Sequence, residues 1–148
     1  MSSKPPIAYV DIRVFAHATE DPQKVQCAVR NLMPDELAQT ILFETANLTG
    51  HHGNPIILFT SRLTDKKLLA KALERIGGGL NSLDKEQLYT DWKLHLDKGN
   101  LYLRFDKQSA FVGAFKFAQN DPIHVKIHFK NKTAEQIADL CKSSGLLP

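Results

Sequence analysis

The feature that most constrains this chain is a strictly alternating stretch near its carboxyl end, "PIHVKIHFK" at 122–130. Every second residue is apolar, namely Ile123, Val125, Ile127 and Phe129. The residues between them are lysine or histidine, namely His124, Lys126, His128 and Lys130. Successive side chains of a strand point to opposite faces, so the pattern predicts a strand with one buried face and one polar face.

The stretch "IAYVDIRVFAHAT" at 7–19 has the same two-residue period. Its apolar positions are Val10, Ile12, Val14 and Ala16. The positions between them are Asp11, Arg13, Phe15 and His17. We therefore expect a second strand whose outer face is polar and partly aromatic.

The other elements follow from periodicity, turn residues and helix caps. Further strands are expected at 40–48, 55–63, 100–107 and 110–118, and helices at 22–33, 65–76, 82–96 and 134–144. Asp21, Thr64 and Thr133 are the expected caps of three helices, and "GGG" at 77–79 is expected to end one of them.

This order of elements predicts an α+β fold. It is a two-layer sandwich with a mostly antiparallel sheet and helices on one face, so that the other face is open to water. No repeat or linker divides the chain, and we expect one domain over 1–148 with a short disordered lead at 1–6.

Composition favours a soluble protein with a packed core. Hydrophobic residues make up 43% of the 148 positions. No apolar run approaches the roughly 20 residues that span a bilayer, and the amino end "MSSKPPIAYV" lacks the apolar segment of a secretory signal. Cys27 and Cys141 form no CxxC motif and are expected as free thiols beside the core. We expect a cytoplasmic protein without membrane contact.

The open face of the predicted sheet combines basic and aromatic side chains. Strand alternation places these residues there: Arg13, Phe15, His17, Tyr102, Arg104, Lys126 and Lys130. Basic groups neutralise phosphates, and exposed aromatic rings stack on unpaired bases, so the face suits RNA. The alternative is a solvated face on which loops cover Phe15 and Tyr102. The net charge of +3 does not decide between them.

The loop "GHHGN" at 50–54 raises a separate question, because two histidines lie between two glycines. It separates two expected strands, which predicts a hairpin with a wide loop. A zinc ion on His51 and His52 would need two further ligands, for which the sequence offers only His17. The histidines could instead act as general acid and base in RNA cleavage. The remaining alternative is a turn whose glycines supply positive φ angles.

A third candidate is the segment "RFDKQSAF" at 104–111. Asp106, Lys107 and Gln108 offer an acid, a base and an amide at the expected end of a strand. The alternative is an ordinary polar turn, which the residue types of this segment favour when it is taken by itself.

Three segments, "FAHATEDPQKV", "GHHGNPI" and "LYLRFDKQSAF", resemble in order and spacing an archaeal RNA-binding protein family often labelled an exosome subunit. The resemblance covers about 7–142, and "GHHGNPI" is its most specific part. It implies RNA binding without a cofactor, and a fold like that of the large-subunit ribosomal protein that binds five-S RNA. The family's motif positions fall on His17, Thr19, Glu20, Asp21, Gly50, His51, His52, Gly53, Asn54, Arg104, Asp106, Lys107 and Gln108.

These observations predict an RNA-binding protein that is not an enzyme and has no catalytic residue, metal or cofactor. Besides the open-face residues, the expected RNA contacts are His51, His52, Asn54, Lys107 and Gln108. RNA is the expected partner, with exosome or ribosomal components in RNA processing, degradation or ribosome biogenesis. Two alternatives stay open: a protein-binding assembly subunit without RNA contact, and a metal-independent ribonuclease that uses His51, His52 and Lys107.

Overall fold

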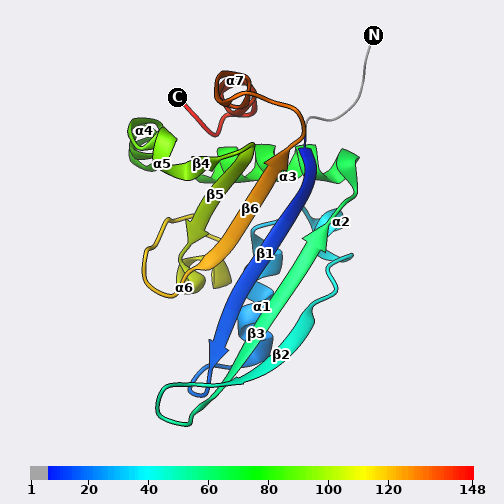
Figure 1. The fold of residues 1–148 in the computed structure, drawn as a ribbon, viewed down its shortest axis with the longest axis vertical. Coiled ribbons are helices and arrows are strands. Elements are labelled where there is room, and N and C mark those ends of the chain that lie inside the picture. Colours follow the sequence, from blue (N-terminus) through cyan, green and yellow to red (C-terminus); the bar gives the residue numbers. More distant parts are fainter. Residues whose placement is uncertain (1–6) are drawn as a thin grey trace.

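The chain forms a six-stranded antiparallel sheet in the order β2-β3-β1-β6-β5-β4 (Figure 1). The computed structural model describes residues 7–148, and the lead expected at 1–6 lies outside them. The strands are β1 (Ile7–His17), β2 (Glu44–Thr49), β3 (Pro55–Leu63), β4 (Leu96–Asp97), β5 (Asn100–Phe105) and β6 (Ile123–Phe129). The helices are α1 (Pro22–Asn31), α2 (Asp35–Ala38), α3 (Lys66–Gly79), α4 (Ser82–Thr90), α5 (Trp92–His95), α6 (Lys107–Phe111) and α7 (Ala134–Ser144).

The helices form a second layer on one side of the sheet. In Figure 1, α1, α3 and α6 lie behind the strands, and no described element lies in front of them. The apolar face of β6 meets this layer and is at most 2% exposed at Ile123, Val125, Ile127 and Phe129. The expected α+β fold with an antiparallel sheet is thus confirmed. No described helix has the length and apolar character needed to cross a membrane.

Several expected helix ends are confirmed by their hydrogen bonds. The side chain of Asp21 accepts a bond from the backbone N of Gln23 at 2.9 Å and caps α1. Thr133 and Gln136 form the reciprocal bonds of a capping box at the start of α7. Gly145 ends that helix in the left-handed conformation at φ 88°.

The prediction of a strand at 110–118 is wrong. Helix α6 occupies the start of this segment, because the side chain of Asp106 accepts bonds from the backbone N and Oγ of Ser109 at 2.9 and 2.7 Å. Gly113 then turns the chain at φ 81°. Phe115 and Phe117, which suggested a strand, pack instead around the ring of Phe105 in the core, whereas Phe111 is 41% exposed.

The glycines at 77–79 do not end the helix as expected, since α3 continues through Gly79. Gly77 is buried where the end of α7 crosses α3. A Cβ atom there would lie 2.7 Å from the carbonyl oxygen of Ser144 and 2.8 Å from the backbone N of Leu146. The glycine therefore permits close packing of two backbones.

Three other boundaries differ from expectation. Helix α3 is capped by Asp65 and not by Thr64, since the Asp65 side chain accepts a bond from Leu68 N at 3.4 Å. The helix expected at 82–96 divides into α4, α5 and the short strand β4. The strand expected at 40–48 begins only at Glu44.

Candidate nucleic-acid interface

A row of three nitrogen-rich side chains crosses the open face of the sheet. Arg13 of β1 pairs with His124 of β6, which pairs in turn with Arg104 of β5. Directly paired residues of antiparallel strands share one face, with Cβ atoms about 4.5–5.5 Å apart. Two guanidinium groups therefore lie on either side of one imidazole. We call Arg13, His124 and Arg104 the basic row.

The next row on the same face is partly neutralised within the protein. Asp11 pairs with Arg62 on one side and with Lys126 on the other, and Lys126 pairs with Tyr102. Arg62 donates two hydrogen bonds to the Asp11 carboxylate, at 2.7 and 2.9 Å. The Lys126 ammonium is 4.0 Å from the same carboxylate, and the Lys126 side chain is 31% exposed. Tyr102, at the end of the row, is 38% exposed.

Both rows line a hollow of about 720 Å³ in the open face. This volume lies within the range of about 300–1,000 Å³ that small-ligand sites occupy. The side chains of Arg13, Arg104, Lys126 and Tyr102 border it together with those of Glu44 and Thr60. The open face is therefore hollowed where its basic groups gather.

The arginines of the chain differ in how they are used. Three have acceptors within the protein: Arg30, Arg62 and Arg75. In the described part of the chain, Arg13 and Arg104 have neither a hydrogen-bond acceptor nor an ion-pair partner. A guanidinium group is suited to bidentate bonds with phosphate. The two arginines without a partner both belong to the basic row.

His124 is uncharged at neutral pH in this setting. Its pKa lies below the ordinary value, because burial disfavours the imidazolium and both Arg13 and Arg104 repel a further positive charge. Asp121 acts weakly in the opposite direction. The basic row thus carries two positive charges in the free protein, those of the two arginines. An anion bound between the arginines would favour protonation of His124, which would add a third positive charge.

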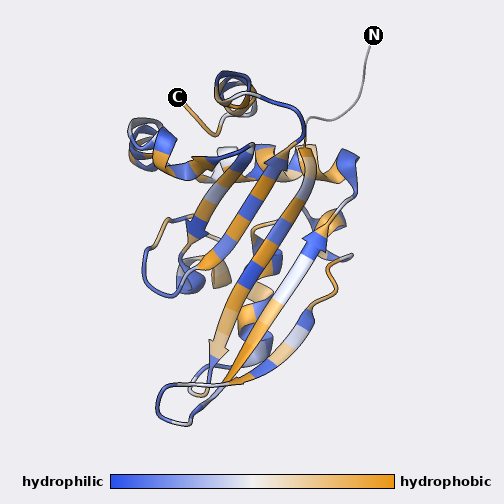
Figure 2. Cartoon of the chain, in the orientation of Figure 1, coloured by the Kyte–Doolittle hydropathy of each residue, from blue (hydrophilic) through white to orange (hydrophobic). Residues whose placement is uncertain are grey.

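The lower part of the open face is apolar. Phe15 of β1 pairs with Leu58 of β3, which pairs with Ala46 of β2, and Ile56 pairs with Leu48 in the next row. Figure 2 shows this part of β3 as a continuous hydrophobic stretch. We call this surface the apolar shelf: Phe15, Ala46, Leu48, Ile56 and Leu58. It places Phe15 on the same face as the basic row.

The loop 50–54 forms the tip of the β2–β3 hairpin that the sequence predicts. Gly53 has φ 78°, in the left-handed region that favours glycine, as the sequence predicts for this turn. The backbone N of Gly50 donates to the carbonyl of Asn54 at 2.7 Å. His51 and His52 are exposed, with ring centroids 4.9 Å apart. A hollow of about 160 Å³ lies between this loop and His17, and Lys107 does not line it.

Lys107 has a different environment from the one expected, since only 8% of the residue is exposed. Its Nζ donates to the carbonyl of Phe15 at 2.7 Å, to Glu20 at 2.9 Å and to Asp121 at 2.7 Å. The Nε2 atom of His17 lies 3.0 Å from the same Asp121 oxygen. This cluster ties the end of β1 to the start of α6 and to the loop before β6.

The same cluster contains the one group of possible metal ligands found among the described residues. His17, Glu20 and Asp121 offer ligand atoms within 4.8 Å of one another. However, the Lys107 ammonium already binds both carboxylates, so the cation that these acids require is supplied by the protein itself. We infer an internal ion-pair cluster at this place.

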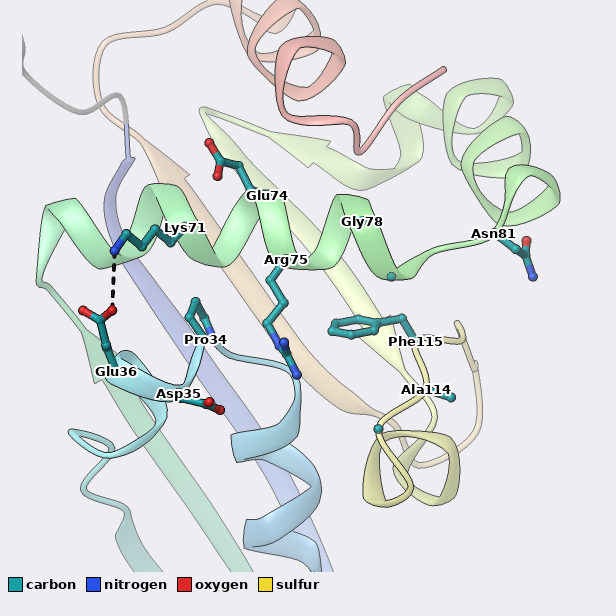
Figure 3. A pocket seen from close by; sticks show the side chains of 12 residues that line it. Pro34, Asp35, Glu36, Lys71, Glu74, Arg75, Gly78, Asn81, Ala114 and Phe115 are labelled. Carbon is teal, nitrogen blue, oxygen red and sulfur yellow. Dashed lines mark ion pairs between the residues drawn. The ribbon is translucent and has the colours of Figure 1, made fainter.

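A second large hollow, of about 790 Å³, lies on the helix side between α2, α3 and α6 (Figure 3). The two basic side chains that line it already have partners within the protein. Lys71 is 3.5 Å from Glu36, and Arg75 donates to the carbonyl of Asn31 at 3.0 Å. Arg75 also lies over the ring of Phe115. With Asp35 and Glu74 among its lining residues, this hollow is unsuited to a polyanion.

Comparison with known proteins agrees with the chemistry of the open face. A family model described as RNA binding matches residues 9–129. The chain belongs to this RNA-binding family. An RNA-binding protein of Pyrococcus abyssi is 37% identical over 124 residues, which cover 82% of this chain and 80% of that protein.

Two solved structures of related proteins share the fold. A protein of Methanothermobacter thermautotrophicus is 26% identical, with a TM-score of 0.75 over 96% of this chain and 98% of its own. A protein of Sulfolobus solfataricus is 27% identical, with a TM-score of 0.73 over 91% and 98%. Both are described as DUF54 proteins, and neither description names an exosome or a ribosomal protein.

The match to the RNA-binding family spans the basic row, the apolar shelf and the Lys107 cluster. The remaining expected contacts Asn54, Gln108 and Lys130 are exposed, and Lys130 follows the end of β6, so strand register does not place it. The sequence reasoning missed Asp121 and the shelf residues of β2 and β3. The unbroken run "IILF" at 56–59 was a usable signal, because it makes both faces of β3 apolar.

Proposed function

We propose that this protein binds RNA through the open face of its sheet. The basic row and Lys126 hold phosphates, and Tyr102 and Phe15 contact unpaired bases. The observation that carries this proposal is that Arg13 and Arg104, which have no hydrogen-bond acceptor or ion-pair partner among the described residues, lie on either side of His124 in an uncovered hollow. The family membership supports it independently.

Site-directed variants test the proposal directly. Arg13→Ala and Arg104→Ala should each weaken the binding of single-stranded RNA about tenfold at low salt, because each removes a charge-assisted contact. Each should also flatten the dependence of log affinity on log salt concentration by about 0.7. Lys67→Ala, on the helix layer, is the matched control and should bind as the wild type does. Unchanged affinity in both arginine variants would exclude the open face as the RNA site.

We further propose that the protein binds RNA without cleaving it. The described residues that line the hollow beside His51 and His52 include no lysine or arginine that would stabilise a phosphorane, and Lys107 is held in its own cluster. Labelled RNA should therefore stay intact during incubation with the protein in the presence of a chelator. Cleavage that is lost in His51→Ala and His52→Ala would favour the ribonuclease alternative instead.

The cellular role that we propose is in RNA processing and degradation with the exosome, or in ribosome biogenesis, in the cytoplasm. The resemblance of the "GHHGNPI" segment supports this role, as does the likeness that it implies to the five-S-RNA-binding ribosomal protein. Sequencing of RNA crosslinked to the protein in its native cells tests it. Recovery of exosome or ribosomal subunits without any crosslinked RNA would favour the assembly-subunit alternative.

A further inference from the structure

Strand β2 reverses the polarity expected of a two-layer fold, and its neighbour β3 is apolar on both faces. The side of β2 that faces the helix layer carries Thr45, Asn47 and Thr49, all exposed. The side that faces water carries Ala46 and Leu48, and Leu48 is 43% exposed. In a sheet covered on one face, apolar residues belong on the covered face and polar residues on the open one. Packing within the described part of the chain therefore does not explain why the shelf residues are apolar.

The apolar shelf is continuous with the basic row. Phe15 lies two residues beyond Arg13 on β1, so the two side chains share a face and lie about 6.6–6.8 Å apart along the strand. Leu58 extends the surface sideways from Phe15, and none of the five shelf residues is charged. A ligand that covers both surfaces must combine negative charge with flat apolar faces.

Unpaired nucleotides have this combination, and a base-paired duplex does not expose it. The phosphates of a single strand are separated from its bases by the sugar, so the two parts contact neighbouring surfaces. A second copy packed shelf against shelf would match the apolar surface, but none of the five shelf residues is acidic, so its shelf would bring no carboxylate to Arg13 and Arg104. The charge pattern therefore favours a nucleic-acid occupant.

We propose that the apolar shelf is the base-binding half of the RNA site, on which unpaired bases pack against Phe15, Leu58 and Leu48 while the phosphates lie on the basic row. This inference rests on the RNA-binding function proposed above. It assigns the ligand class as single-stranded RNA with unstacked bases, and it gives the β2–β3 hairpin a role in binding.

Two ligands separate the two halves of the site. We would compare an oligouridylate of ~12 nucleotides, within the range of single-strand site sizes, with an abasic ribose-phosphate oligomer of the same length. The test variant carries Leu48→Thr and Leu58→Thr, since threonine keeps the strand preference and removes the apolar surface. Asn47→Thr is the matched control, because it lies on the same strand and points to the other side. Thermal unfolding verifies that each variant is folded.

The wild type should bind oligouridylate more tightly than the abasic oligomer. The double variant should bind oligouridylate about tenfold more weakly and the abasic oligomer unchanged, with an unaltered salt slope. The control should match the wild type on both ligands. An equal loss on both ligands, or no loss on either, overturns the inference.

The outcomes also separate this inference from the proposed function. If the shelf variant behaves as the wild type while Arg104→Ala weakens both ligands, the basic row binds RNA and the shelf does not. If the wild type binds neither ligand, the proposed function is wrong, and the inference that rests on it is wrong as well. If the wild type sediments as a dimer that the shelf variant dissociates without a change in RNA affinity, the shelf is covered by a second copy and the inference is wrong.

Discussion

Lys107 illustrates how one buried residue can fix the geometry of several segments. Its ammonium has three classes of acceptor: a backbone carbonyl of β1, the Glu20 carboxylate and the Asp121 carboxylate. An ammonium group has three donors, so this set satisfies it and offsets much of the cost of burial. Without Lys107, the Glu20 and Asp121 carboxylates would share only the imidazole of His17.

Lys107→Met should lower the free energy of unfolding by about 2–3 kcal/mol, because it removes the charge-assisted bonds to Glu20 and Asp121 and leaves Glu20 without its cation. Urea denaturation measures this change. Gln108→Met is the control on the neighbouring exposed position and should stay within about 0.5 kcal/mol of the wild type. A Lys107→Met variant as stable as the control would show that the cluster contributes little.

His124 should link RNA affinity to pH. Its pKa is depressed in the free protein by burial and by the two arginines, and a phosphate between those arginines would raise it. The complex then binds more protons than the free protein, so affinity should rise as the pH falls through the ordinary histidine range near 6.5.

Titration of RNA affinity in the wild type and in His124→Gln measures this linkage. The rise in affinity between pH ~7.5 and ~5.5 should be about three- to tenfold larger in the wild type. The other five histidines are the same in both proteins, so the difference between the two profiles isolates His124. Parallel profiles would show that no phosphate binds within the basic row.

Strand alternation was sufficient to place single residues on a face but not to pair them. Arg13, Phe15, Tyr102, Arg104 and Lys126 were all expected on the open face, and the strand register puts them there. The bonds that decide which cations are free were not predictable. They join residues that are far apart in the sequence, and they depend on strand order and register.

Secondary-structure elements with strong local signals were predicted well, and those decided by tertiary contacts were not. Strands β1 and β6 and helix α7 follow from alternation or from a capping box within the element itself. The course of α3 through 77–79 depends instead on the approach of a distant helix. Glycines usually end helices, but here one of them makes room for a neighbouring backbone.

Two adjacent glycines of α3 should respond in opposite ways to alanine. Gly77→Ala should destabilise the protein by about 1–3 kcal/mol, because the new Cβ meets backbone atoms at 2.7–2.8 Å that cannot rotate away. Gly78→Ala meets nothing within 4 Å and should stabilise the helix by about 0.5–1 kcal/mol. Chemical denaturation measures the free energy of unfolding of both variants. Equal changes in the two variants would contradict the close contact between α3 and the end of α7.

Two positively charged surfaces, the basic row on the open face and the lysines of α3 on the helix layer, lie on opposite sides of the hydrophobic core. The lysines of α3 lie on the helix layer, away from the basic row, so a single RNA strand on the open face does not reach them. The overall charge of +3 is the same whichever face binds RNA, and only the fold reveals the division.

Charge reversal on each face tests this division. The double change Lys67→Glu with Lys71→Glu should leave RNA affinity within about threefold of the wild type, a cost below ~1 kcal/mol. Arg13→Glu with Arg104→Glu makes the same change in net charge and should abolish measurable binding. Mobility shifts at one fixed salt concentration compare the two. A loss of tenfold or more in the lysine variant would mean that RNA also contacts the helix layer.

The two cysteines, which differ sharply in environment, make this chain convenient for fluorescence work. Cys141 is buried, which raises the pKa of its thiol to about 12 and keeps it unreactive, whereas Cys27 is exposed on α1. A maleimide dye should therefore attach at Cys27 alone in the native protein. Because α1 belongs to the helix layer, the dye would sit behind the open face and report on RNA binding without obstructing it.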